Sequence, residues 1–450
     1  MPIQQMFLGL GAAPDSYWWL LFGNLTSNNE RIYDMHLDSS DNIYAAGFTS
    51  VGPNGGQDGL AVMFDKDGAL QWQRAQGAGS GNDNWYGCAL DNANNLWCYG
   101  QDVTAYKMTY GKLTTSNQTW SLSKRYEQAS GRPSQGCRGS DGGSYPSYCF
   151  ACGSTSYTNK QGWVWGHNLS GQNSGGSKLT ATDNTDGTGT ARQLWPQAIC
   201  SGKSSGDIHT CGYVDDLVWT GNVSRNVGFI VKLNDYAGAV TWQRFIGTNY
   251  TNIGGIDTDS SDNVYVAGQD NDGTGTKAFV AKYNSSGTIQ WQRRLGDPCD
   301  GGTFAIAVDD SGNSYSCGKT MSGQSGWIAK LDASGSTVWC RTIVSESSDE
   351  EELQQIRLDS KGNIVIAGWH RDDSESANDI ALVMRLPSDG SFTGTFGKFT
   401  FASASPTNAA ANMTTSTSTY IARSTNQVDP QAFTIDQDTP SFSTTLQAIE

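Results

Sequence analysis

The chain has 450 residues, including 54 Gly, 15 Trp, 18 Tyr and 15 Phe, and only 16% of its residues are charged. Its formal net charge is −15, and its Lys and Arg residues form no run longer than two. Nucleic-acid binding depends on clustered basic residues, so we exclude a nucleic-acid partner. A membrane-spanning helix needs about 20 apolar residues in succession, and no such run is present.

The chain opens with MPIQQMFLGLGAAP (residues 1–14), a segment that is apolar and uncharged. It lacks the basic region of a secretion signal, and its apolar core is short. We therefore expect a mature N-terminal arm over residues 1–15, followed by a single domain over residues 16–450.

A turn rich in Asp, Ser, Asn and Gly, followed by alternating β-formers and a glycine, recurs along the chain. Its closest copies are DSSDNIYAAG, DSSDNVYVAG, DDSGNSYSCG and DSKGNIVIAG, which end at Gly47, Gly268, Gly318 and Gly368. Weaker copies end at Gly100, Gly153 and Gly212, so successive glycines lie 50 to 59 residues apart. So regular a period indicates a repeat array. Because no helical periodicity accompanies it, the pattern predicts an all-β fold.

The second half of each repeat is recognisable as well. Residues 59–77, 228–247 and 278–296 each contain a strand, a turn with Gly, and a strand that carries Trp five residues before a Gly. Together with the hairpin before it, each repeat therefore has four strands. Four short strands in about 54 residues are typical of one blade of a β-propeller.

The two ends of the chain bear on the number of blades. TYIARSTNQVDPQAFTIDQ (residues 419–437) follows the same plan, with Arg423 in the place of the glycine. It predicts an eighth copy and thus an eight-bladed propeller; seven blades is the alternative, because this copy is degenerate. Trp18 precedes Gly23 by five residues, as in the internal repeats. We therefore expect the N-terminal strand to complete the last blade and close the ring.

The recurring Trp has two interpretations. Sugars stack on exposed aromatic rings, but a residue repeated once per blade at a fixed strand position is more typical of packing between blades, and we favour packing. The column comprises Trp18, Trp72, Trp242, Trp291 and Trp339, with Tyr126 in the same register. Better candidates for exposed contacts lie off this column: Trp85, Trp97, Trp163, Trp165, Trp195, Trp219, Trp327 and Trp369.

The acidic turns at Asp38, Asp65, Asp259 and Asp309 raise the question of calcium binding. Calcium needs six or more converging oxygen ligands, and these turns offer two acids at most, so we expect turn chemistry instead. The ten cysteines leave two hypotheses open. Either Cys88/Cys98, Cys200/Cys211 and Cys137/Cys149 (or Cys137 with Cys152) form cross-strand disulfides, or these residues serve as small buried hydrophobic side chains.

Sequence signals for catalysis are poor. His36, His167, His209 and His370 share no motif, and no nucleophile elbow, phosphate-binding loop or metalloprotease helix is present. We accordingly expect a protein that is not an enzyme, with no catalytic residue, no metal ligand and no cofactor.

Two resemblances add to this interpretation. Residues 358–392, LDSKGNIVIAGWHRDDSESANDIALVMRLPSDGSF, resemble one unit of the β-propeller repeat families of bacterial and phage surface proteins. The opening MPIQQMFLGLGAA resembles the start of virion structural proteins from marine and cyanobacterial phages. The second resemblance covers about a dozen residues.

The resemblance to virion proteins implies a tail-associated or capsid-surface component, assembled into the virion in the host cytoplasm. Its arm would contact other virion proteins, and its propeller would serve in decoration or in adhesion to a host-surface glycan. The alternative is a secreted or surface propeller that binds polysaccharide, as an adhesin or lectin does.

Overall fold

The computed structural model shows an all-β protein. The described residues form strands and turns and no helix, so none of them provides a helix that could cross a membrane. The structure describes residues 4–8, 17–23, 29–50, 56–77, 81–102, 107–126, 133–138, 148–155, 161–168, 173–183, 190–215, 218–219, 222–223, 226–234, 239–247, 250–271, 273–345, 349–372, 378–411, 413–416, 421–424, 431–432, 436–438 and 447–448.

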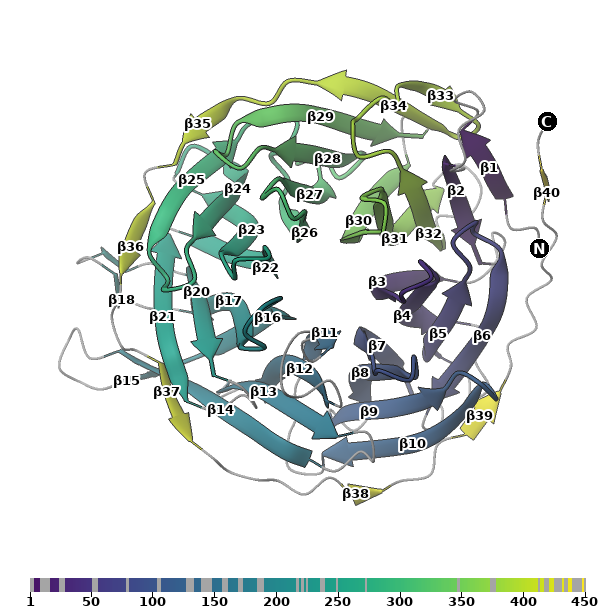
Figure 1. Cartoon of the computed structure of the whole chain (residues 1–450), viewed down its shortest axis with the longest axis horizontal. Helices are drawn as coiled ribbons and strands as arrows, with labels where there is room; N and C mark the ends of the chain where they lie inside the picture. The colour runs from purple at the N-terminus through teal and green to yellow at the C-terminus, as the bar shows by residue number, and fades with distance from the viewer. Residues whose placement is uncertain are drawn as a thin grey trace.

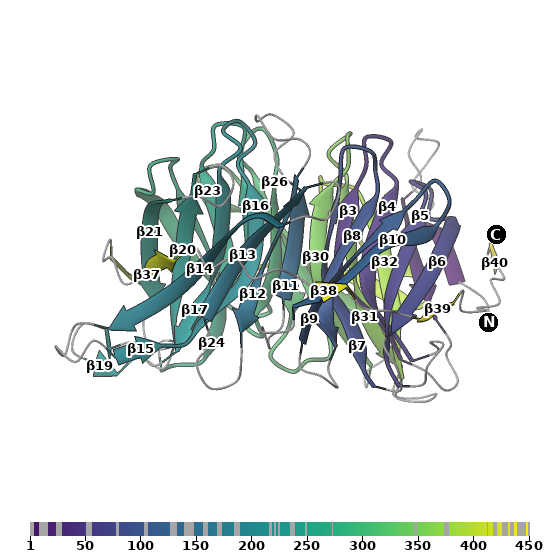
Figure 2. The ribbon, with the colours of Figure 1, turned by 90° about the horizontal axis from the view of Figure 1, so that it is seen from below.

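Four-stranded antiparallel units follow one another around a central axis, with the first strand of each unit innermost (Figure 1). Figure 2 shows the same ring from the side. Units 1 to 3 are, from the axis outward, β3 (Glu30–Leu37), β4 (Ile43–Thr49), β5 (Asp58–Phe64) and β6 (Leu70–Gly77); β7 (Asp83–Leu90), β8 (Leu96–Asp102), β9 (Lys107–Thr114) and β10 (Thr119–Tyr126); and β11 (Pro133–Arg138), β12 (Tyr148–Thr155), β13 (Gln161–Asn168) and β14 (Asn173–Asp183).

Units 4 to 6 continue the ring with the same internal order. They are β16 (Leu194–Ser201), β17 (Ile208–Asp215), β20 (Asn226–Leu233) and β21 (Val240–Gly247); β22 (Tyr250–Thr258), β23 (Val264–Asn271), β24 (Thr276–Tyr283) and β25 (Ile289–Leu295); and β26 (Thr303–Val308), β27 (Ser314–Lys319), β28 (Gly326–Leu331) and β29 (Thr337–Val344). Between β14 and β20, three short strands stand outside this scheme: β15 (Thr190–Arg192), which pairs with β14, and the pair β18 (Val218–Trp219) and β19 (Asn222–Val223).

The seventh unit contains strands from both ends of the sequence. Its inner strands are β30 (Glu350–Leu358), β31 (Ile364–Asp372) and β32 (Asn378–Leu386), and its outer strand is β2 (Tyr17–Phe22), antiparallel to β32. The expected pairing of the N-terminal strand with a late unit is thus present. Trp18 lies opposite Arg385, the register that Trp291 has opposite Lys282.

The glycine of the repeat has a steric cause. The inner strand bulges opposite it, between Ile32 and Asp34 in unit 1 and at the same place in the other units. A Cβ atom on Gly47 would lie 1.7 Å from the carbonyl oxygen of Arg31, and one on Gly368 would lie 2.0 Å from that of Glu352. Any side chain at this position would therefore displace the bulge.

The eighth copy predicted over residues 419–437 is not confirmed, because the described strands in this range pair with outer edges of other units and not with each other. Arg423 cannot replace a glycine whose Cβ would collide with backbone, and its strand pairs instead with the outer edge of unit 3. From residue 394 the tail runs backwards around the rim, adding an edge strand to one unit after another (Figure 1). The strands are β34 (Phe399–Ala404) on β29, with β33 (Gly394–Phe396) beside it, β35 (Asn408–Ala410) on β25, β36 (Thr414–Ser416) on β21, β37 (Ile421–Ser424) on β14, β38 (Gln431–Ala432) on β10, and β39 (Asp436–Asp438) on β6. We call residues 394–448 the belt.

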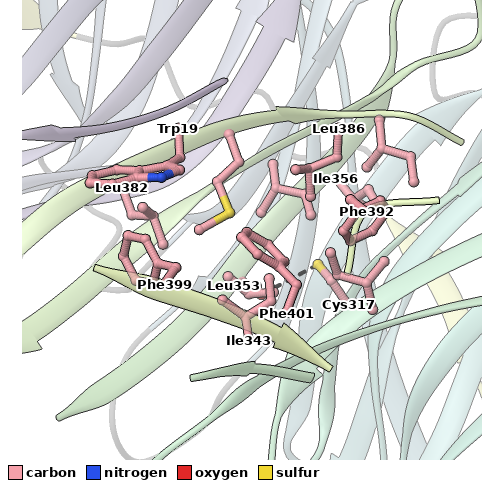
Figure 3. Packing of buried hydrophobic residues seen from close by; sticks show 14 of the residues in the cluster. Trp19, Cys317, Ile343, Leu353, Ile356, Leu382, Leu386, Phe392, Phe399 and Phe401 are labelled. Atoms are coloured by element: carbon pink, nitrogen blue, oxygen red, sulfur yellow. Dashed lines mark hydrogen bonds between the residues drawn. The ribbon is translucent and has the colours of Figure 1, made fainter. Parts of the chain in front are cut away.

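The belt ends beside the N-terminal arm. Strand β1 (Gln4–Leu8) lies antiparallel to β2, and the last belt strand, β40 (Gln447–Ala448), lies parallel to β1. The start of the belt also contributes to the core between units 6 and 7, where Phe399 and Phe401 pack with Trp19 and Leu353 (Figure 3). The Trp19 and Phe399 rings meet edge to face, with centroids 4.9 Å apart.

Candidate functional site

The Trp column packs between units, as expected. The indole Nε1 atoms of Trp242, Trp291 and Trp339 each donate a hydrogen bond to a carbonyl in the outer turn of the next unit, at Ser285 (3.1 Å), Ala333 (3.0 Å) and Ser388 (3.2 Å). Trp18 makes the same bond to Lys66 of unit 1, at 3.2 Å. In unit 2 the equivalent register position belongs to Leu122 and not to Tyr126, which pairs with Met108 at the end of β10.

The tryptophans off the column offer little surface for a sugar. Trp97 and Trp327 are fully buried, Trp85, Trp163 and Trp369 are buried, and Trp195 is half-buried against Tyr213. Trp165 and Trp219 lie outside the residues whose side chains are described. The idea that this group supplies exposed aromatic contacts therefore finds no support among the described side chains.

The acidic turns follow turn chemistry. Asp38 accepts hydrogen bonds from the Ser40 and Asn42 amides through one carboxylate oxygen, and from the Asn42 side chain and the Tyr44 hydroxyl through the other. The turns at Asp259 and Asp309 repeat the same four bonds, and Asp65 accepts two backbone bonds of the same kind. These carboxylates are used inside their own turns and do not converge as calcium ligands do.

The cysteines whose side chains are described are not joined by disulfides. Cys88 and Cys98 do lie opposite each other on β7 and β8, as predicted. The other two pairs are out of register, because Cys211 lies opposite Ala198 and Cys137 opposite Phe150. A pair not anticipated from the sequence is Cys299 and Cys340, whose sulfurs lie 3.8 Å apart at the contact of units 5 and 6.

An open cavity of about 400 Å³ lies among the innermost strands, and we call it the axial pocket. Its wall includes residues of β3, β16, β22, β26 and β30, so five units contribute to it. Its charged and polar side chains include those of His36, Lys203, Asp257, Gln355 and Arg357. Lys203 lies 4.0 Å from Asp257. With His36 and Arg357, the lining has three groups that can carry positive charge and one carboxylate, which suits a small polar or anionic ligand.

A buried carboxylate behind this wall connects three units. Asp34 of unit 1 accepts hydrogen bonds from the backbone N–H of Cys88 at 3.0 Å and from Gln355 Nε2 at 2.6 Å. Arg357 lies 3.6 Å from the same carboxylate. Together Asp34, His36 and Cys88 place one potential metal-ligand atom each within 4.8 Å of one another. Burial, followed by the nearby Asp34 charge, raises the pKa of the Cys88 thiol.

The four histidines are dispersed. His36 lies on the pocket wall, and the side chain of His167 is outside the described set. His209 is fully buried between units 4 and 5, and burial lowers its pKa to about 3. His370 is buried with Nδ1 3.1 Å from Glu351. The buried Asp349 of this polar cluster lies 3.8 Å from Lys398 of the belt, so the cluster joins the belt to unit 7.

Known structures share this fold. Neither a protein-family model nor a curated protein sequence matches the chain. Among solved structures, the chain resembles hydrazine synthase of Kuenenia stuttgartiensis, with 9% identity over 79% of this chain and 99% of that one, at a TM-score of 0.50. The β-propeller domain of the trilobed protease of Pyrococcus furiosus has 8% identity, with 81% and 98% coverage and a TM-score of 0.46. The polysaccharide lyase Uly1 has 8% identity, with 79% and 89% coverage and a TM-score of 0.48.

These comparisons correct one expectation. We expected a protein that is not an enzyme because catalytic motifs are lacking, yet the structure of hydrazine synthase, an enzyme, shares the fold. A propeller can assemble a site at its axis from residues of several units, and such a site leaves no motif along the sequence. At 9% identity the likeness concerns the fold alone and does not make this chain an enzyme.

Proposed function

We propose that this chain is a seven-bladed propeller, closed by β2, that serves as a structural component on the surface of a phage particle. Its rim would make assembly contacts through the N-terminal arm, and its faces would be presented outward for decoration or for adhesion to the host surface. The belt is the observation that carries this proposal.

The belt bears on the function through the outer strand edges. An exposed edge strand presents unpaired N–H and C=O groups and invites pairing with other chains. Here six units have their outer edge paired by a belt strand, and β2 of the seventh unit is paired by β1. A ring protected in this way suits dense packing beside identical copies, because rim-to-rim strand pairing is suppressed.

The arm and the end of the belt would provide the attachment point. Strand β1 pairs with both β2 and β40, so both terminal segments lie at one place on the rim. Contacts made there would leave the axial pocket and the turns of both faces accessible.

Mass spectrometry of gradient-purified particles, from a phage whose genome encodes the chain, tests this function. We expect peptides of the chain in a fixed ratio to the major virion proteins, and we expect particles made with a chain lacking residues 1–15 to contain less of it. Free chain added to finished particles should not band with them. Absence of the chain from particles would overturn the proposal, whereas specific binding to a glycan array by a chain absent from particles would favour the polysaccharide-binding alternative.

A further inference from the structure

Three side chains with different ligand atoms converge beside the axial pocket. Asp34 and His36 lie two residues apart on β3, and Cys88 lies on β7 of the next unit. Their ligand atoms are all within 4.8 Å of one another, with Asp34 and Cys88 fully buried and His36 half-buried. The group joins adjacent units at the inner strands, where the bulge in β3 falls between Ile32 and Asp34.

The surrounding contacts orient this group. The Cys88 N–H donates to one oxygen of Asp34, which holds the carboxylate beside the residue that carries the thiol. Gln355 Nε2 donates to the other oxygen, and Gln355 is itself bonded to Arg357. Hydrogen bonds of this kind to a ligating carboxylate are what orients the ligands of metal sites in proteins. Asp34 Oδ1 also accepts the Met35 N–H at 2.9 Å. A metal ion would therefore bind at Oδ2, the oxygen that accepts the Cys88 N–H and has two lone pairs.

The combination of donor atoms indicates the metal. A thiolate, an imidazole nitrogen and a carboxylate oxygen together suit Zn²⁺, with bonds of about 2.0 to 2.3 Å. Ligand atoms of a tetrahedral site with such bonds lie about 3.3 to 3.8 Å apart, so the three side chains would need to approach by about 1 Å. Thiolate and carboxylate together balance the charge of the ion, and the thiol proton leaves to solvent on binding.

We propose that Asp34, His36 and Cys88 bind a zinc ion at the wall of the axial pocket. Three protein ligands leave a fourth position for water or a small anion. His36 lies on the pocket wall, so the ion can enter from the pocket. Once the ion neutralises Asp34, the Arg357 guanidinium beside it loses its charge partner, and a small anion bound at the fourth position would take that place.

The test uses the full chain, stripped with a chelator and dialysed. Titration with Zn²⁺ should give one equivalent per chain by calorimetry, and Co²⁺ as a spectroscopic probe should give a thiolate-to-cobalt absorption band. Cys88→Ser should abolish this band, and His36→Ala should lower the affinity for Zn²⁺ on the order of 100-fold or more. Far-UV circular dichroism reports whether each variant is folded.

Cys98→Ser is the matched control, because Cys98 is buried opposite Cys88 on β8 and is not one of the three ligands. It should retain both the affinity and the band. Failure of the full chain to take up one equivalent would overturn the proposal. So would an unchanged affinity in His36→Ala, or an equal loss in Cys98→Ser. If Cys88→Ser does not fold, the half-buried His36 position decides the question.

Discussion

At the scale of single residues, the indoles of the Trp column stabilise the contacts between neighbouring units. Trp339 is buried between units 6 and 7, with its ring edge to face with Phe392 and its Nε1 bonded to Ser388. The adjacent residue of the same strand, Val338, is 54% exposed. Trp339 and Val338 therefore allow a buried and an exposed side chain to be compared on the same strand.

We expect Trp339→Ala to lower the free energy of unfolding by about 3–5 kcal/mol, because it leaves a cavity and an unpaired carbonyl. Val338→Ala should change it by no more than about 0.5 kcal/mol. Urea titrations followed by far-UV circular dichroism measure both values. A similar decrease in the free energy of unfolding in both variants would show that the Trp column does not stabilise the contacts between units.

A second residue-scale prediction concerns pH. His209 is fully buried, neither ring nitrogen has a hydrogen-bond partner, and its pKa is lowered to about 3 by burial. In the unfolded chain the pKa returns to about 6.5. Between these values the unfolded state binds a proton that the folded state does not. The contribution of His209 to stability is therefore present above pH about 6.5 and is lost as the pH falls toward 3.

His209→Leu should remove this contribution. The pH dependence of the free energy of unfolding between pH 4 and pH 6 should become shallower, by up to about 1.4 kcal/mol per pH unit. Denaturant titrations at several pH values measure the slope, and Val338→Ala should keep the slope of the parent chain. An unchanged slope in His209→Leu would mean that His209 is protonated in the folded state.

At the scale of elements, β2 is the outer strand of a unit formed otherwise by the end of the repeat array. Its residues Trp18, Leu20 and Phe22 are buried against units 7 and 1. Each such side chain contributes about 1.5–3 kcal/mol through burial, which together is comparable to the stability of a typical domain.

Deletion of residues 1–25 should therefore lower the melting temperature strongly, whereas deletion of residues 1–15 removes only β1 and should lower it less. Thermal melts compare the two variants. An unchanged melting temperature after deletion of residues 1–25 would refute closure by β2.

The belt leads to a separate prediction about association. A chain ending at residue 393 lacks every belt strand and exposes the outer edges of units 1 to 6. Because such edges pair with other chains, light scattering should show association that increases with protein concentration. A chain ending at residue 416 keeps the strands on units 4 to 6 and should associate less. Two monomeric truncations would contradict this role of the belt.

The elements also show what the sequence could and could not predict. The Asp turns and the glycine of each unit have local causes. Each Asp side chain accepts hydrogen bonds within its own turn, and each glycine lies opposite a bulge in the neighbouring strand. Both features therefore recur visibly in the sequence. The belt strands pair edge by edge with units far away in sequence and need no pattern of their own. The same holds for the contact between the pocket wall and the carboxylate behind it, since Gln355 and Asp34 are 321 residues apart along the chain. Such encounters depend on the ring, which the repeat predicts only in outline.

At the scale of the whole molecule, the ring is held by strand pairing at the junction of its ends, so the position of the chain break should matter little. The arm and the last belt strand already pair, Gln4 with Gln447 and Gln5 with Ala448. A flexible linker can therefore join residue 450 to residue 1. New ends fit between Ser322 and Gly323, in the turn that connects β27 and β28, where Met321 is 57% exposed. A Cβ atom on Gly323 would have no neighbour within 4 Å.

In this circular permutant unit 6 would be completed by strands from both ends of the chain, as unit 7 is in the parent. We expect a melting temperature within a few degrees of the parent, because the same pairings and buried contacts form and exposed turns tolerate new termini. Opening the chain inside β28 instead, between the buried residues Ile328 and Ala329, should prevent folding. If neither permutant folds, the ring depends on continuity of the chain and not on the pairing of its strands.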